Sequence, residues 1–334
     1  MNDRLNLIKN WLESELKIPE YNINKLTGDA SFRQYFRINL PDVSYILMDA
    51  PPGRECCKTF ANLDHFFREN HIHVPKIYAE NITDGFLLLE DFGDDVLLSI
   101  LTPGNADNYY HKAIDIICDI QAAKTNNMTL PPFDKKFMLE EMELFREWLL
   151  KNLLQYPLSS QEDKIITAVF NDLADKIALQ HYAVTHRDFH SRNLMRLPND
   201  ELGVLDFQDA VMGPYVYDLV SLLKDAYITW SRDKTELWLS YFYDTARNRG
   251  LILDINLESL FMDFEITGLQ RHIKVAGIFA RLYKRDGKEA YLKDIPRVLH
   301  YINVALARIE CYHDFYQLLI EKWMPQVEMA TWSK

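Results

Sequence analysis

The stretch that decides the fold runs from residue 182 to residue 208 and reads YAVTHRDFHSRNLMRLPNDELGVLDFQ. Three short apolar runs in it, Ala183 to Thr185, Leu194 to Leu197 and Leu202 to Leu205, are typical of buried strands. Polar loops join them, and the first loop carries the pattern H-R-D-x-x-x-x-N at residues 186–193. Because chemistry is often carried by loops on a rigid scaffold, this stretch is the first candidate for a functional site.

Strand patterns dominate the N-terminal part of the chain, up to about residue 92. Ser31 to Asn39, Ser44 to Asp49 and Gly85 to Glu90 alternate or run apolar, as strands do. Cys56 to Asn70 has helical spacing and interrupts them. We therefore expect a small β-rich lobe over residues 1–92.

Helical patterns dominate after Gly93. They cover Asn108 to Lys124, Lys136 to Leu154, Gln161 to Gln180 and much of the chain from Val216 onward. We expect a large, mostly helical lobe over residues 93–334. The two lobes together predict an α+β fold.

The composition excludes several classes of protein. Of the 334 residues, 48% are hydrophobic and 13% aromatic, which is enough for a sizeable core. The formal net charge of -12 argues against a general nucleic-acid binder, because affinity for a phosphate backbone comes from clustered Lys and Arg. No run approaches the roughly 20 apolar residues that cross a bilayer. We expect no nucleic-acid, membrane or protein partner.

The cysteines and the N-terminus indicate a reducing compartment, with the cytoplasm as the expected location. The four cysteines form no C-x-x-C pair, so neither a zinc site nor a disulfide framework is predicted. The first 18 residues place apolar side chains at helical spacing among charged ones, which predicts a surface helix and not a secretory signal.

The residue types of the 182–208 stretch suit phosphoryl transfer. The γ-phosphoryl group carries charge on several oxygens, so a protein that moves it must hold Mg²⁺ with hard oxygen ligands and place an acceptor hydroxyl in line. Asn193 and Asp206, thirteen positions apart, are the predicted metal ligands. Asp188, five residues before Asn193 on the same loop, is the predicted catalytic base. The alternative is a polar loop with no chemistry.

Two histidines flank Asp188, but their spacing of four on a loop gives no helical face, and no third zinc ligand is evident. We expect His186 to support the loop by hydrogen bonding and His190 to line an acceptor site. Asp218, near the start of a helix, is predicted to brace the loop by accepting backbone hydrogen bonds.

With these motifs the sequence resembles the aminoglycoside phosphotransferase-like kinases, which include choline and homoserine kinases. The resemblance extends from about Leu26 to Tyr316. It implies a bilobal protein-kinase-like fold, with a nucleotide-binding lobe at residues 1–92 and a catalytic and substrate-binding lobe at residues 93–334. It also implies ATP and Mg²⁺ as cofactors.

Three stretches resemble a narrower group, the bacterial N-acetylmuramate/N-acetylglucosamine anomeric kinases. They are GDASFRQYFR at residues 28–37, LDFQDAVMGP at residues 205–214 and LQRHIKV at residues 269–275. The resemblance implies ATP-dependent phosphorylation of the C1 hydroxyl of an amino sugar in peptidoglycan recycling. The alternatives are a kinase of another hydroxyl, on an aminoglycoside, choline or homoserine, and a non-catalytic nucleotide-binding pseudokinase.

The resemblance implies that residues 28–37 form a strand-turn-strand flap over the nucleotide phosphates, with Ser31 at its turn. Arg33 and Arg37 share strand parity and face the same side, where they meet phosphate oxygens or form a solvated strand face. Leu89, Glu90 and Asp91 would form the hinge whose backbone reads adenine, although a plain buried strand has the same pattern.

The third strand departs from the protein-kinase pattern. Residues 44–52 contain no Lys, and the following helix offers Asn62 and Asp64 in place of a well-placed Glu. We expect another cation, Arg33 or Arg37, to replace the missing Lys.

Five residues are predicted on the acceptor side: His190, Asp209, Gln270, Arg271 and Lys274. Asp209 reaches a sugar hydroxyl or amide, or else caps a loop. In the helix predicted from Ser259 to Lys284, Gln270 and Lys274 share a face with Arg271 beside them, and this cluster is solvated or borders the sugar pocket. Because a bidentate Arg suits a planar carboxylate, Arg271 is the predicted partner of the lactyl group that N-acetylmuramate carries.

Overall fold

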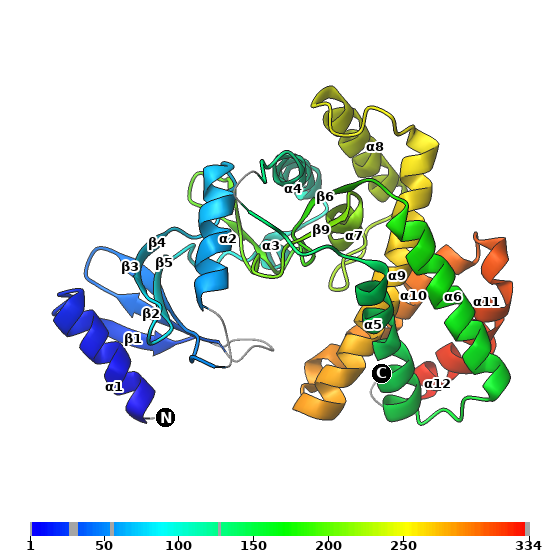
Figure 1. The fold of residues 1–334 in the computed structure, drawn as a ribbon, viewed down its shortest axis with the longest axis horizontal. Coiled ribbons are helices and arrows are strands. Elements are labelled where there is room, and N and C mark those ends of the chain that lie inside the picture. The colour runs from blue at the N-terminus through cyan, green and yellow to red at the C-terminus, as the bar shows by residue number, and fades with distance from the viewer. Residues whose placement is uncertain (1, 27–32, 54–56, 126–127, 331–334) are drawn as a thin grey trace. The chain divides into compact units, whose positions relative to one another are not determined.

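The structure, a computed structural model, describes residues 2–26, 33–53, 57–125 and 128–330. The chain divides into two compact units. The first consists of Met1–Ile100 and Arg192–Asp209, and the second of Leu101–Ser191 and Ala210–Lys334. Figure 1 colours both by position in the chain. The predicted lobe boundary at residue 92 stays a prediction.

The first unit contains a five-stranded antiparallel sheet in the order β1-β2-β3-β5-β4 (Figure 1). Its strands are β1 (Asn22–Lys25), β2 (Gln34–Asn39), β3 (Ser44–Asp49), β4 (Ile77–Asn81) and β5 (Phe86–Glu90). The prediction of β3 is confirmed with the same bounds, and β2 and β5 lie within the predicted ranges. The sequence pattern does not predict β1 or β4, because the side chains of these edge strands are mostly exposed or half-buried.

The N-terminal helix covers one face of this sheet. α1 (Asn2–Asn10) continues into a π-helical turn, η1 (Trp11–Glu15), as expected for a helical segment. Strand pairing places Phe36, Leu47 and Leu88 side by side on the face that it contacts. The resulting apolar cluster consists of Ile8, Trp11, Leu12, Phe36, Ile38, Leu47, Phe86 and Leu88.

A hairpin from the 182–208 stretch completes the first unit, together with α2 (Cys57–Glu69) and α3 (Leu97–Ile100). β7 (Leu194–Arg196) and β8 (Leu202–Val204) pair antiparallel. The hairpin packs on Phe92, because a Cβ atom added at Gly203 would lie 2.4 Å from the Phe92 ring. Only glycine permits this close approach.

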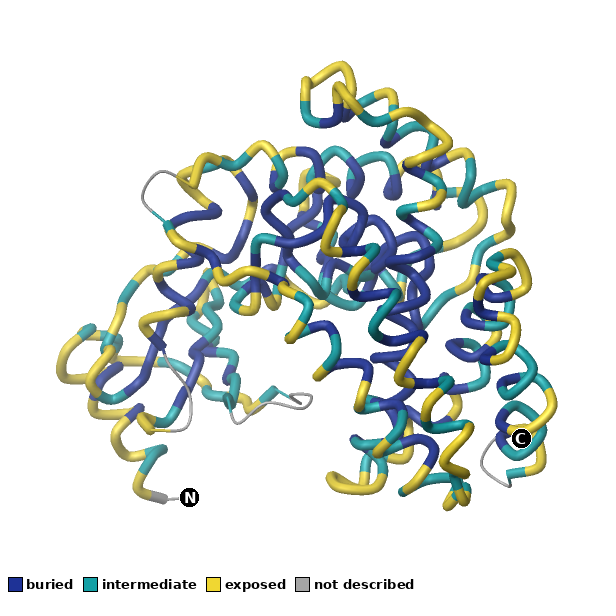
Figure 2. The backbone as a smooth tube through the Cα atoms, turned by 45° about the vertical axis from the view of Figure 1, so that its right-hand side comes forward, coloured by how far each residue is buried: buried dark blue, intermediate teal, exposed yellow. Residues whose placement is uncertain are grey.

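The second unit is mostly helical, with continuous buried stretches inside it and exposed outer turns (Figure 2). Its main helices are α4 (Ala106–Gln121), α5 (Lys135–Leu144), α6 (Ser160–Ala178), α7 (Tyr217–Leu223), α8 (Arg232–Asn248), α9 (Leu257–Asp286), α10 (Ile295–Leu306), α11 (His313–Leu318) and α12 (Met324–Met329). α9 is 30 residues long, and most of its residues from Phe264 to Leu282 are buried. The helical core forms around it.

The strands predicted in the 182–208 stretch are confirmed. β7 pairs with β8, whereas β6 (Tyr182–Thr185) pairs with β9 (Val211–Pro214) in the second unit. One sequence-based expectation for the second unit needs correction. The single helix expected from Lys136 to Leu154 is α5 followed by a π-helical segment, η2 (Phe145–Leu153). The change of helix type occurs where the backbone of Leu144 and Phe145 approaches Gly277 of α9 most closely.

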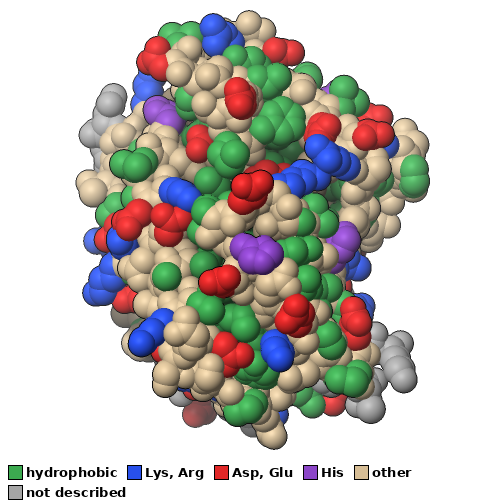
Figure 3. Space-filling view, turned by 90° about the vertical axis from the view of Figure 1, so that its right-hand side faces the viewer, with side chains coloured by type: hydrophobic (Ala, Val, Ile, Leu, Met, Phe, Trp, Pro, Cys, Tyr) green, Lys and Arg blue, Asp and Glu red, His purple; other side chains and the backbone are tan. Residues whose placement is uncertain are grey.

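Charged side chains of both signs are mixed on the surface of the protein. On the face shown in Figure 3, basic and acidic side chains are interspersed and do not gather by sign. Within the described ranges, none of the helices combines the length and apolar character that a membrane crossing needs.

Substitution of two glycines of α9 tests the helix contact. A Cβ atom at Gly277 would lie 2.3 Å from the backbone carbon of Leu144, whereas one at Gly268 meets its nearest atom at 3.6 Å. We expect Gly277→Ala to lower the free energy of unfolding by about 1–3 kcal/mol, because backbone atoms cannot give way. Gly268→Ala, the matched control, should raise it by up to about 1 kcal/mol. Urea denaturation measures both, and equal shifts would contradict the contact.

Candidate active site

A buried carboxylate on α7 holds the start of the catalytic loop, residues 186–193. His186 N donates to Asp218 Oδ2 at 2.7 Å, and Arg187 N donates to Asp218 Oδ1 at 2.8 Å. Asp218 is 1% exposed, so these bonds replace the water that its oxygens would otherwise bind. Burial raises the pKa of Asp218 to about 6, although His186 and the two backbone bonds oppose the shift. The predicted bracing role of Asp218 is confirmed.

Arg187 adopts a backbone conformation that residues other than glycine rarely adopt, with φ of 77°. Ser221 Oγ on α7 donates to its carbonyl oxygen at 3.2 Å, and its own guanidinium donates to Glu141 Oε1 at 2.7 Å. Neighbours on two helices therefore hold both the backbone and the side chain. Such support is what allows strained backbone to persist at functional sites.

Asp188, the next residue, is half-buried among positive charges. Burial raises the pKa of a carboxyl group, but neighbouring cations outweigh burial here and hold the pKa of Asp188 well below its ordinary value. The side chains that lower it, in order of effect, are those of Lys274, His190, Arg187 and Arg271. Asp188 is therefore ionised at neutral pH, which is the state in which a carboxylate accepts a proton.

A second buried carboxylate holds the loop further along. Asp225, just after α7, accepts hydrogen bonds at Oδ2 from Ser191 N at 3.0 Å and from Ser191 Oγ at 2.5 Å. Its other oxygen accepts from Tyr227 N at 2.9 Å, and the Tyr227 ring meets the His190 ring edge-on with centroids 5.3 Å apart. The predicted acceptor residue His190 thus lies on a segment fixed on both sides.

The predicted acceptor cluster on α9 is buried. Gln270, Arg271 and Lys274 are 0%, 2% and 5% exposed, so the solvated alternative is wrong. Their helix runs through the interior of the second unit. Gln270 and Lys274 share a face, as predicted, because both bind Glu141, at 3.2 Å and 3.0 Å.

Arg271 differs from its neighbours. Among the described residues, its Nε and Nη1 atoms are buried and have no hydrogen-bond partner. Burying guanidinium donors without partners costs free energy, and an anion whose oxygens accept from them recovers it. Arg271 therefore has unused capacity for a carboxylate or phosphate group.

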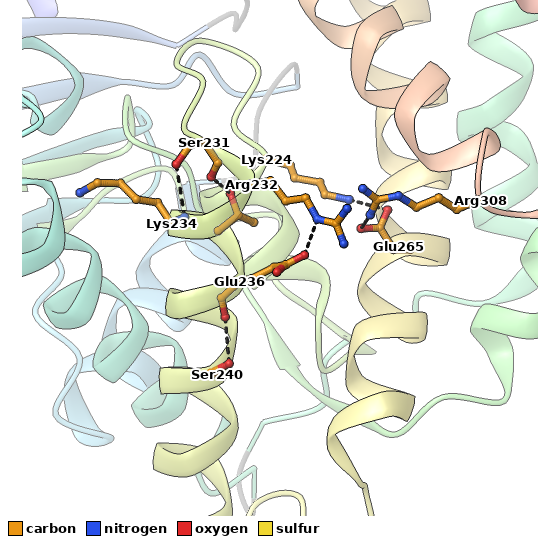
Figure 4. A network of polar contacts seen from close by, with 9 residues as sticks. Lys224, Ser231, Arg232, Lys234, Glu236, Ser240, Glu265 and Arg308 are labelled. Carbon is orange, nitrogen blue, oxygen red and sulfur yellow. Dashed lines mark hydrogen bonds and ion pairs between the residues drawn. The ribbon is translucent and has the colours of Figure 1, made fainter.

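Polar contacts join α7 to α9 beside this cluster (Figure 4). Lys224 Nζ binds Glu265 Oε2 at 2.8 Å, and Arg308 approaches the other oxygen of Glu265 at 3.7 Å. His272 Nε2 lies 2.9 Å from the carbonyl oxygen of Lys224. Burial lowers the pKa of His272 to about 3, so this histidine is neutral and structural.

The predicted metal ligands meet in the first unit, at the open end of the β7-β8 hairpin. Leu205 N donates to the Asn193 carbonyl at 2.8 Å, which brings Asp206 beside Asn193. Asn193 Nδ2 lies 3.4 Å from Asp206 Oδ2, and Gln208 Nε2 donates to Asp206 Oδ1 at 2.7 Å. Asp206 itself has φ of 62°, another strained backbone at a candidate functional position.

These two residues fit Mg²⁺. The Asn193 amide and the Asp206 carboxylate lie beside each other and supply the hard oxygen ligands that Mg²⁺ takes, and Mg²⁺ usually keeps several waters beside one or two carboxylates. No group of three or more His, Cys, Asp or Glu forms a metal cluster in the part of the chain that the structure describes.

Phe207 packs against Phe60 and Phe67 of α2, with centroids 4.8 Å and 5.7 Å away, and fixes the backbone between Asp206 and Asp209. Asp209 is exposed.

The predicted hinge is organised by Asp91. Asp91 Oδ2 accepts from Ser44 Oγ at 2.7 Å, and Oδ1 accepts from Gly93 N at 2.9 Å. Arg37 of β2 pairs with Asp91 at 2.7 Å and with Asp94 at 2.8 Å. Arg37 is thus engaged by the hinge, and a phosphate would compete with these partners for it.

The other predicted nucleotide residues lie along the same sheet. Leu89 is buried in β5 opposite Ile46, and Glu90 ends that strand. Arg33 is half-buried just before β2, and Ser31 lies outside the described residues. Beyond the hinge, the first unit has a cavity of about 400 Å³ lined by Phe92, Gly93, Asp94, Asp95, Arg196, Leu197, Pro198 and Asp200.

The structure adds residues that the sequence analysis missed. Glu141 and Asp225 are the most important, because each binds the catalytic loop. Glu141 carried a usable signal: it lies three residues after Met138 and four before Phe145, so it falls on an apolar helix face where a carboxylate needs a partner. Asp225 follows a helix end and has no comparable pattern.

Comparison with known proteins identifies the family. The family model described as "Phosphotransferase enzyme family" matches residues 22–250. This chain belongs to that family. It is 37% identical over 316 residues to the N-acetylmuramate/N-acetylglucosamine kinase of Pseudomonas putida, covering 91% of this chain and 92% of the relative. It is 34% identical over 319 residues to the protein of the same name in Neisseria meningitidis, covering 94% of each.

Solved structures of the same architecture are more distant in sequence. Choline kinase LicA from Streptococcus pneumoniae has a TM-score of 0.63 at 17% identity and covers 89% of this chain and 98% of its own. ADP-bound aminoglycoside phosphotransferase APH(2'')-Ib has a TM-score of 0.60 at 17% identity, covering 88% and 97%. The predicted fold class and both levels of the predicted resemblance are confirmed.

The helix after the third strand carries a buried carboxyl group. Asp64 of α2 is completely buried, and within the described ranges neither of its carboxyl oxygens has a hydrogen-bond partner. Burial raises the pKa of Asp64 to about 7, and the charge of Arg68 only partly opposes this. Asp64 is therefore largely protonated below neutral pH.

This raised pKa predicts a pH-dependent stability. Between the ordinary pKa of 3.8 and about 7, the folded state keeps a proton that the unfolded state has released, so stability falls as pH rises through this window. We expect Asp64→Asn to remove a slope of up to about 1.4 kcal/mol per pH unit. Denaturation of wild type and variant at pH 5, 6 and 8 measures it. The exposed control Asp42→Asn should keep the wild-type slope; a slope retained by Asp64→Asn would refute the assignment.

Proposed function

We propose that this phosphotransferase is an ATP- and Mg²⁺-dependent kinase that phosphorylates the C1 hydroxyl of N-acetylmuramate and N-acetylglucosamine. The observation that carries the proposal is the ionised Asp188 on a loop braced by Asp218, in a chain 37% identical to a kinase of that name. The reaction belongs to peptidoglycan recycling, with the cytoplasm as its compartment. Residues 1–92 serve the nucleotide, and residues 93–334 serve catalysis and the acceptor.

Asp188 accepts the proton of the attacking hydroxyl. The anomeric hydroxyl of a sugar is more acidic than an ordinary alcohol, so a carboxylate that stays ionised at low pKa suffices as the base. Its fixed position contributes more than its basicity, because phosphoryl transfer depends mainly on orientation and charge stabilisation.

Asn193 and Asp206 hold the metal. Mg²⁺ bound there supplies positive charge to the β- and γ-phosphate oxygens. Gln208 supports this role, because its amide at 2.7 Å orients the Asp206 carboxylate before any ion arrives. The hinge at Leu89, Glu90 and Asp91 receives the adenine edge.

Ser31, Arg33 and Arg37 serve the phosphates in this proposal. The engagement of Arg37 by Asp91 and Asp94 supports Arg33 as the cation that replaces the missing Lys, with Arg37 fixing the hinge. His190, Asp209, Gln270, Arg271 and Lys274 serve the acceptor sugar.

Replacement of the base tests the reaction itself. We expect Asp188→Asn to fold, to bind nucleotide and to lose at least about 100-fold in kcat, because an amide cannot accept the proton. Product formation from N-acetylmuramate and N-acetylglucosamine, with the phosphate located by NMR, provides the measurement. The exposed control Asp314→Asn should retain full turnover. Full turnover by Asp188→Asn would overturn the proposal. So would a wild-type enzyme that forms product only from choline, homoserine or an aminoglycoside, or one that binds nucleotide and forms no product.

Arg271 provides a test of acceptor recognition. Its unpartnered donors are available to an oxygen of the lactyl carboxylate of N-acetylmuramate, which N-acetylglucosamine lacks. Loss of a charge-assisted pair at about 1.5–3 kcal/mol predicts that Arg271→Ala raises the KM for N-acetylmuramate about 10- to 100-fold. The KM for N-acetylglucosamine should change little. Arg285→Ala, on the exposed end of the same helix, is the control; equal effects of Arg271→Ala on both sugars would count against the role.

A further inference from the structure

Glu141 connects three elements of the second unit. It lies on α5 and is 6% exposed. Oε1 accepts from Arg187 of the catalytic loop at 2.7 Å and from Lys274 of α9 at 3.0 Å, and Oε2 accepts from Gln270 of α9 at 3.2 Å. One side chain therefore binds the residue before the candidate base and two residues of the candidate acceptor cluster.

The charge of Glu141 is needed for this arrangement. Two buried cations, Arg187 and Lys274, share its carboxylate, and both have exposed fractions of 14% or less. Removing one partner of a buried ion pair leaves the other charge uncompensated, which is costlier than the pair itself. A neutral side chain of the same shape can accept hydrogen bonds but cannot compensate two positive charges.

The contact with Arg187 bears directly on the base. Arg187 holds a left-handed backbone at φ of 77°, and its guanidinium lies over the Phe137 ring, 4.8 Å from the centroid. Its position is thus determined by Glu141 and Phe137 on α5 as well as by α7. Any relaxation of this side chain is transmitted to the adjoining peptide of Asp188, since strained backbone persists only while its surroundings hold it.

The contact with Lys274 affects charge. Burial lowers the pKa of Lys274, but Glu141 is the strongest of the groups that raise it, and the net direction is upward. The other groups facing Lys274 are Tyr217 of α7, which accepts from Nζ at 3.3 Å, and Asp188 and Arg187 of the catalytic loop. Lys274 is in turn the largest positive influence on Asp188.

We propose that Glu141 is a positioning residue of the phosphotransferase site, which acts through Arg187 on the backbone of Asp188 and through Lys274 on the charge beside it. The expected effect of Glu141 on turnover rests on the proposed function. The expected effect of Glu141 on the catalytic loop does not rest on it. The two effects are measured separately.

Glu141→Gln is the decisive variant, with the exposed neighbour Glu140→Gln as matched control. We expect kcat to fall at least tenfold in Glu141→Gln, with the KM for ATP within about twofold of wild type, because the nucleotide residues lie in the other unit. Without Glu141 the pKa of Lys274 falls, so the alkaline limb of the kcat profile moves to lower pH. A purely structural role would lower the amount of folded enzyme and leave this limb in place.

Amide hydrogen exchange tests the loop without reference to any substrate. The amides of residues 182–190 should exchange at least tenfold faster in Glu141→Gln than in Glu140→Gln, since the support of Arg187 is lost. Unchanged exchange overturns the inference even if the wild type phosphorylates amino sugars. Faster exchange supports it even if the acceptor proves to be a different hydroxyl compound, in which case the proposed function alone fails.

A second variant covers a failure of Glu141→Gln to fold. Glu141→Asp keeps the charge but withdraws the carboxylate by one methylene group. We expect a smaller fall in kcat, faster exchange in the loop and an alkaline limb close to that of wild type. Wild-type kcat together with wild-type exchange in Glu141→Asp would overturn the inference.

Discussion

The candidate site depends on a buried carboxylate that accepts two consecutive backbone N–H groups. Asp218 lies on α7, a helix buried along its whole length, and receives the N–H groups of His186 and Arg187. Buried polar groups must be paired, so this carboxylate and these two amides require each other. The left-handed backbone of Arg187, and with it the direction of Asp188, follows from that requirement.

Charge balance is the second constraint on this unit. Arg187, Arg271 and Lys274 lie close enough to affect Asp188, and three carboxylates, those of Glu141, Asp188 and Asp218, lie among them. Cations away from water are stable only with anions nearby, and these carboxylates supply that charge. Arg271 still has two buried donors without a hydrogen-bond partner among the described residues, so it has capacity for a phosphate or carboxylate oxygen.

Much of this could be predicted from the sequence, for reasons that differ between elements. β3 was predicted with correct bounds because its four central residues, Tyr45 to Met48, are apolar and the strand pairs on both sides. β1 was not predicted, because the residues of this edge strand are mostly exposed and polar. Asp188, Asn193 and Asp206 were found because their chemistry requires fixed types at fixed spacing. Glu141 was missed because its partners Arg187 and Lys274 are 46 and 133 residues away in the chain (187 − 141 and 274 − 141) and no local pattern connects them.

The amino-acid sequence by itself determined the fold class, the family and the three residues of the motif, because each depends on short-range patterns of polarity and residue type. Only the tertiary structure decided that Gln270, Arg271 and Lys274 are buried, that Arg37 is engaged by the hinge, and that Glu141 and Asp225 hold the catalytic loop. The physical reason is that burial and ion pairing depend on which helices pack together. The sequence around Lys274 would read the same whether its side chain were solvated or buried and paired, so the sequence could not distinguish the two.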